Sequence, residues 1–61
     1  MKHGDLVQKT RGEDVGVVAS VLEIETDSFG TTMVKVAVIG PTGVEIKTWP
    51  KKLVEVIGES N

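Results

Sequence analysis

The residue best suited to binding another molecule is Trp49, the single tryptophan, in the segment VEIKTWPKKLVEV at residues 44–56. An indole ring can stack on a base, a proline or a methylated lysine, and lysine ammonium groups can hold a phosphate backbone. Trp49 therefore heads a set of candidate nucleic-acid or partner-binding residues, completed by the nearby Lys47, Lys51 and Lys52 and by Lys35 from a neighbouring predicted strand.

A structural role for the same segment is the alternative. Trp49 directly precedes Pro50, where the chain is expected to turn. A large aromatic side chain at such a corner can close the end of a small β-barrel, with the lysines forming a solvated rim. Both roles are compatible if the indole is half exposed.

Other residues with chemical capacity are few. Glu23, Glu25 and Asp27 stand two apart on one predicted strand and could bind a cation or act in acid–base chemistry. No histidine or glycine-rich phosphate loop accompanies them, so we expect a solvated face. His3 alone cannot form a metal site, and the chain has no cysteine. We therefore expect no catalytic residues, no cofactor and no metal, and a protein that is not an enzyme.

Size and composition indicate one small domain. A chain of 61 residues forms a single domain over 1–61, of which 58–61 is expected to be a frayed tail. The net charge of −2 argues against a bulk-electrostatic nucleic-acid binder. The chain lacks an apolar run of about 20 residues and a signal-peptide pattern at its start. We expect a cytoplasmic protein with no membrane association, in a host cytoplasm if it is phage-encoded.

The elements that must position these residues are strands, because β-branched residues dominate and glycines interrupt the periodic runs. The run at 15–26 carries apolar residues at both parities, which predicts a bend or bulge in mid-strand. A tight hairpin is expected at 41–43 and one 3-10 turn at PKKL. The strands are expected at 4–10, 15–26, 31–40, 44–49 and 54–57.

The expected faces of these strands follow from alternation. Val34, Val36 and Val38 should face the core, joined by Val44 and Ile46, with Glu45 and Lys47 turned outward. Further apolar residues then fall on a second face that one core cannot bury: Val17, Ala19, Val21, Met33, Ala37 and Ile39. We expect part of that face to meet a protein partner or another copy. The candidate interface residues are Phe29, Met33 and Ile39.

Short connections require antiparallel pairing, since parallel strands need a long crossover. Five strands with a single helical turn before the last one predict an all-β, five-stranded SH3-like antiparallel barrel. An OB-like barrel is the alternative, although that fold usually carries a helix between its third and fourth strands.

The chain also resembles known families. GDLV followed by VGVVASV is similar to the opening of SH3-like barrels of the KOW and Tudor kind, on Gly4, Asp5, Val7, Gly16 and Val18. The closing TWPKKLVEVI resembles that of uncharacterised small barrel proteins of tailed phages. The resemblance covers nearly the whole chain and implies a fold rather than a site.

A second likeness is to the plasmid-type (type II) dihydrofolate reductases, which are tetrameric SH3-like barrels. The matching positions are Gly4, Asp5, Val7, Trp49, Pro50, Val54, Glu55 and Ile57. The family's Val-Gln-Ile-Tyr motif is replaced, because Lys47, Thr48 and Trp49 stand where Gln, Ile and Tyr would fall.

The prediction from sequence is therefore a non-enzymatic interaction or assembly module. The first alternative is a nucleic-acid-binding module of KOW type, and the second is an enzyme of the reductase type. A Tudor-type methyl-lysine cage needs several aromatic rings, whereas this chain has only Trp49 and Phe29.

Overall fold

The computed structural model describes residues 1–60. It is all-β: five strands form one antiparallel sheet in the order β4-β3-β2-β1-β5. The strands are β1 (Leu6–Lys9), β2 (Val18–Thr26), β3 (Thr32–Gly40), β4 (Gly43–Pro50) and β5 (Val54–Gly58), with the 3-10 turn η1 (Lys51–Leu53) before β5. The predicted five strands, their antiparallel pairing and the single 3-10 turn before the last strand are confirmed. Within the described residues no helix is long and apolar enough to cross a membrane.

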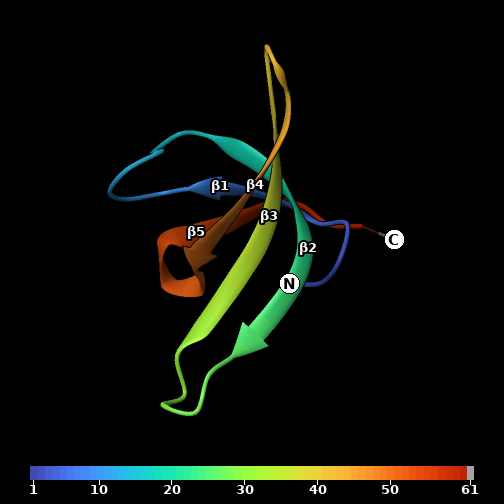
Figure 1. Ribbon diagram of the computed structural model, residues 1–61. Helices are drawn as coiled ribbons and strands as arrows, with labels where there is room; N and C mark the ends of the chain where they lie inside the picture. The colour runs from blue at the N-terminus through green and yellow to red at the C-terminus, as the bar shows by residue number, and fades with distance from the viewer. Residues whose placement is uncertain (61) are drawn as a thin grey trace.

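Strand β2 contains the predicted irregularity. Its pairing with β3 shifts in register between Val21 and Glu23, which makes Leu22 an extra residue in the ladder. Before this bulge Ala19 and Val21 point into the core, and after it Ile24 lies opposite the buried Val34. In Figure 1, β2 bends so that β1 and β5 run across the direction of β3 and β4. The bulge thus lets one strand serve both halves of a curled sheet.

The core is small and lies inside this curl. It consists of Val7, Ala19, Val21, Val34, Val36 and Trp49, with Val17, Val38, Val54 and Val56 packed against it. The expectation that Val34 and Val36 face inward is confirmed. Val17, Ala19 and Val21 belong to the core side, so assigning them to a second face was wrong. The bulge at Leu22, rather than a second buried face, accounts for the mixed parity of β2.

The faces of β4 are the reverse of those predicted. Gly40 pairs with Gly43 across a two-residue turn, and this register places Lys47 opposite Val36 and Trp49 opposite Val34. Directly opposed residues share a face, so Trp49 and Lys47 lie on the core side. Val44 and Ile46 point outward and are 64% and 51% exposed. This register buries the indole of Trp49 and leaves the two smaller aliphatic side chains in water.

The two ends of the described chain are held together by Asp5, which is 2% exposed. Its Oδ2 accepts a hydrogen bond from Lys2 N at 2.9 Å, and its Oδ1 accepts one from Ser60 N at 2.7 Å. Gly4 precedes it with a φ of +90°, and a Cβ there would lie 3.0 Å from Ser60 Oγ. The Gly-Asp pair at the start of β1 is thus a structural latch. Asn61, the last residue of the expected frayed tail, lies outside the described residues.

Candidate functional site

Trp49 lies in the core, at 4% exposure. Its ring is covered by Lys9, whose Nζ lies 5.6 Å from the ring centroid. Lys9 is itself 6% exposed, and its Nζ donates a 2.7 Å hydrogen bond to the carbonyl oxygen of Glu13. The aromatic face and the carbonyl together compensate the buried ammonium group. The structure therefore presents Trp49 as packing, and its indole face is not open to a ligand.

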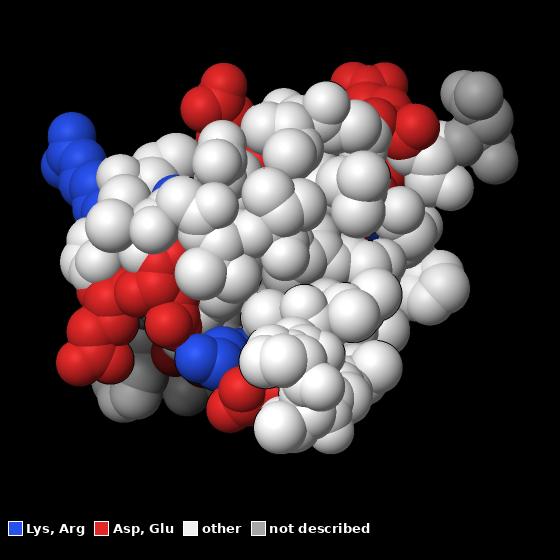
Figure 2. Space-filling model, turned by 90° about the horizontal axis from the view of Figure 1, so that it is seen from above, with Lys and Arg blue, Asp and Glu red and all other residues white. Residues whose placement is uncertain are grey.

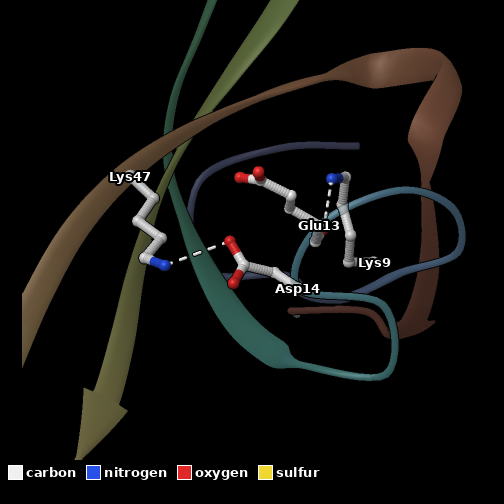
Figure 3. A network of polar contacts seen from close by, with 4 residues as sticks. All are labelled: Lys9, Glu13, Asp14 and Lys47. Carbon is white, nitrogen blue, oxygen red and sulfur yellow. Dashed lines mark hydrogen bonds and ion pairs between the residues drawn. The ribbon is translucent and has the colours of Figure 1, made fainter.

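The loop at residues 10–17 closes over this end of the core (Figure 3). Gly16 N donates to the carbonyl of Lys9 at 2.8 Å, and Val17 N to that of Asp14 at 2.9 Å. Asp14 has a φ of +64°, a conformation that aspartate tolerates better than most residues. This geometry directs the Asp14 carboxylate to Lys47 on β4, where Oδ2 and Nζ lie 3.0 Å apart.

The ion pair changes the acidity of both partners. The Lys47 ammonium holds the pKa of Asp14 below its ordinary value of 3.8, with smaller contributions from the nearby Trp49 and Lys9. The Asp14 carboxylate in turn raises the pKa of Lys47 above 10.5. Both groups are charged at neutral pH and occupied with each other. Lys47 consequently has a structural role, because it holds the loop at residues 10–17 through Asp14.

The candidate binding set from the sequence is dispersed. Trp49 and Lys47 lie on the core side of β4. Lys35 lies on the opposite face of the sheet, paired with Glu23 and Thr48. Lys51 and Lys52 are exposed on η1. The structure does not bring these five residues into one surface.

Lys51 and Lys52 do share a surface pocket of about 440 Å³ with the β2–β3 turn. Its remaining lining residues are Gly30, Thr31, Thr32 and Pro50. Asp27 shapes the turn, because its Oδ1 accepts hydrogen bonds from Phe29 N and Thr31 N, each 2.9 Å long. The lining thus includes two lysines and two threonines.

The carboxylate row does not form a metal centre. Glu23 pairs across the strands with Lys35, Glu25 with Met33, and Asp27 is used in the turn. Among residues 1–60 no group of three histidine, cysteine, aspartate or glutamate side chains is placed to hold a metal ion.

Five of the exposed large apolar side chains lie on the sheet face opposite the core, which we call the outer face. Leu6, Ser20, Ala37 and Ile46 form one row across β1, β2, β3 and β4, so all four side chains share this face. Ile39 and Val44 form the next row towards the hairpin end. Val18 lies two residues from Ser20 on β2 and shares the face too. The exposed apolar residues of the outer face are therefore Leu6, Val18, Ile39, Val44 and Ile46.

Figure 2 views the molecule from the end that carries the β3–β4 hairpin. In Figure 2 a broad area without charge occupies the middle of the view, and charged side chains lie around its margins. Ile39 is the most exposed member of the outer face at 83%. A cluster of large apolar side chains left in water on one face indicates a contact surface.

The predicted interface residues are placed differently from one another. Ile39 belongs to the outer face, whereas Phe29 is 92% exposed at the tip of the β2–β3 turn. Met33 is half-buried and lies on the outer face as well, at the other end of β3 from Ile39. Sequence reasoning missed Leu6, Val18, Val44 and Ile46. The available signal was the two-residue hairpin at Pro41–Thr42, which fixes the β4 register and turns Val44 and Ile46 to the side of Ile39.

Compared with protein-family models, with curated proteins and with solved structures, the chain has no match in any of the three.

Proposed function

We propose that this protein is a non-enzymatic assembly module, built as an SH3-like barrel, that acts by binding a second copy of itself through the outer face. The supporting observation is the set of five exposed apolar side chains on that face, led by Ile39 at 83% exposure. A small domain buries little apolar surface in its own core. Burying the apolar area of the outer face on association would therefore add a stabilising contribution that is large for a domain of this size.

The strand order supports the barrel part of the proposal. A sheet ordered β4-β3-β2-β1-β5 with η1 between β4 and β5 is the arrangement expected of a small SH3-like barrel. The bend of β2 at its bulge curls the sheet in the required direction (Figure 1). Shape and fold alone assign no chemistry, so the function rests on the outer face.

A second copy is the occupant that the outer face itself favours. The central rows of the face carry no charge: Leu6, Ser20, Ala37 and Ile46, then Ile39 and Val44. The charged residues of this face lie outside these rows: Glu23, Glu25 and Lys35 further along β2 and β3, and Glu55 on β5. An uncharged apolar surface is complementary to its own image, and such isologous contacts are the commonest way in which proteins form dimers.

Sedimentation equilibrium over a range of protein concentrations tests this proposal. The wild type should associate reversibly, and Ile39→Lys should weaken association because it places a charge on the apolar contact face. Phe29→Lys is the matched control, since it makes the same kind of change at an exposed apolar residue off the face. A wild type that stays monomeric, or an Ile39→Lys variant that associates like the wild type, contradicts the proposal.

A nucleic-acid-binding role is a second candidate, and the pocket beside η1 favours it. Lys51 and Lys52 can contact phosphates there, with Phe29 exposed on the adjoining turn. Anisotropy of a labelled oligonucleotide should then show binding that weakens steeply with salt and is lost in a Lys51→Gln, Lys52→Gln variant. Binding that is unchanged in this variant, or absent at low salt, excludes the pocket as a nucleic-acid site.

A further inference from the structure

Strand β4 is an edge strand of the sheet. The edge of β4 that points away from β3 has no partner strand within the described residues. In the order β4-β3-β2-β1-β5 it pairs only with β3. The hairpin turn closes with the Gly40–Gly43 pair, and hydrogen-bonded pairs alternate with non-bonded pairs from there. The main-chain groups of Val44, Ile46 and Thr48 therefore point away from β3. Within residues 1–60, the main-chain N–H and C=O groups of these three residues make no hydrogen bond to a turn or loop either.

We propose that two copies of the chain pair antiparallel through their β4 edges, with the two-fold axis at Ile46. This inference rests on the proposed function, and it adds a specific mode and register to it. Val44 of each copy then lies opposite Thr48 of the other, and Ile46 lies opposite its own counterpart. The free main-chain groups of all three residues are used in the new ladder.

The charges of β4 select this register. Glu45 and Lys47 are the charged side chains of the strand, and both lie on the core side. An axis at Ile46 places Glu45 of each copy opposite Lys47 of the other, so that two opposite-charge pairs form. Shifting the axis to Glu45 or to Lys47 sets like charges directly against each other. Like charges in directly opposed positions destabilise a sheet, whereas opposite charges stabilise it.

The hydrogen-bond phase of the strand agrees with the same register. Because Val44, Ile46 and Thr48 turn their main-chain groups to the open edge, the Glu45–Lys47 positions are the non-bonded pairs of the new ladder. Side chains approach most closely in such pairs. The direction of the main-chain groups is compatible with this register, and the charge pattern selects it over the neighbouring registers with an axis at Glu45 or Lys47.

An inward-facing lysine on an edge strand often protects a sheet against pairing. Lys47 is placed differently here, because the carboxylate of Asp14 already neutralises it at 3.0 Å. An ammonium group has three donors, so Lys47 can keep Asp14 and also reach Glu45 of the second copy. Lys47 also stays half-exposed. The charge of Lys47 therefore does not prevent pairing of the β4 edges; it sets the register of that pairing.

The other edge strand, β5, has no charge pattern that would select a register for pairing with its own copy. Strand β5 spans five residues, Val54–Gly58, against eight in β4. Glu55 is its one charged residue, so no register of β5 with its own copy brings opposite charges together. Pairing through β4 also places two outer faces side by side. Ile46 of one copy then contacts Ile46 of the other on the outer face, so the β4 part of that face takes part in the contact between copies.

Complementary charge variants test the register. Glu45→Lys replaces both cross-copy ion pairs by like-charge pairs and should raise the dissociation constant roughly 10- to 100-fold. Lys47→Glu should do the same and is combined with Asp14→Asn, which removes the repulsion from the loop. An equimolar mixture of the two proteins should form heterodimers, because each copy then supplies the charge that the other lacks. Native mass spectrometry separates the species by mass.

The outcomes distinguish this inference from the proposed function. Glu25→Lys, an equal charge change on β2, should associate like the wild type, and circular dichroism checks that every variant is folded. If Glu45→Lys associates like the wild type while Ile39→Lys does not, the edge pairing is wrong and the outer face stands. If folded complementary variants fail to form heterodimers, the register is wrong. A wild type that remains monomeric overturns both.

Discussion

Ile39 lies directly opposite Val44 at the end of the β3–β4 hairpin, and both side chains are exposed to solvent. Val36, three residues before Ile39, is fully buried on the other face of the same strand. Val36 thus stabilises the folded chain, whereas our proposal assigns Val44 to the contact between copies. This division can be measured with the same substitution at both positions.

Val36→Ala should lower the free energy of unfolding by about 2 kcal/mol, since two buried methyl groups are lost and a cavity remains. Val44→Ala should change it by less than about 0.5 kcal/mol at concentrations where the protein is monomeric, because the side chain is already in water. Urea denaturation followed by Trp49 fluorescence gives both values. Equal losses for the two variants would show that β4 has the opposite register.

Asp5 should make the protein sensitive to acid. The hydrogen bond from Ser60 N, opposed by burial and supported by the bond from Lys2 N, lowers the pKa of Asp5 below 3.8. A carboxylate with a lowered pKa adds stability that is present above its unfolded pKa and is lost as pH falls through the folded value. Stability should therefore decline below about pH 4.

Asp5→Asn should destabilise the protein at neutral pH and flatten its dependence on acid. The two oxygens of Asp5 each accept one main-chain N–H, and asparagine offers only one acceptor oxygen. Asp27→Asn is the matched control, because a single oxygen of Asp27 accepts both of its hydrogen bonds. Urea midpoints between pH 2 and pH 7 for the three proteins decide the matter. Equal urea midpoints for Asp5→Asn and Asp27→Asn over this pH range would contradict the role of Asp5 as a latch.

Gly30 should resist replacement because of its backbone conformation. Its φ is +82° and no atom lies within 4 Å of the position of a Cβ, so strain is the sole cost. Gly30→Ala should destabilise the protein by about 1–2 kcal/mol. Gly58→Ala is the comparison, since a Cβ there would meet Leu6 at an ordinary 3.5 Å. Thermal unfolding should show a clear loss for the first variant and little for the second.

The sequence predicted the order of elements well because local chemistry determines it. The glycines at the turns, Pro50 before η1 and the mixed parity of β2 each indicated a feature that the structure contains. The face of β4 could not be predicted in the same way. Ile46 and Trp49 compete for the core from opposite parities, and the choice depends on the register with β3.

The candidate binding residues do not form one surface, and strand register is again the reason. Lys35, Lys47 and Lys51 are close in the folded chain only if the strands place them on one side. The tight β3–β4 turn sets a register in which Lys35 lies opposite Thr48 and Lys47 lies opposite Val36, so the two lysines are on opposite faces. The contact between Lys47 and Asp14 joins residues 33 apart in sequence, and no local pattern signals it. The outer face emerged only when pairing across β1 to β4 was known.

Isoleucine methyl groups provide the most direct measurement of the central claim that the outer face binds a second copy. The chain has four isoleucines: Ile39 and Ile46 lie on the outer face, whereas Ile24 pairs opposite the core residue Val34 on β2 and Ile57 lies on β5. In a dilution series of protein labelled at these methyl groups, the resonances of Ile39 and Ile46 should shift with concentration, and those of Ile24 and Ile57 should stay fixed. Concentration-independent resonances for Ile39 and Ile46, or shifts confined to Ile57, would contradict the account.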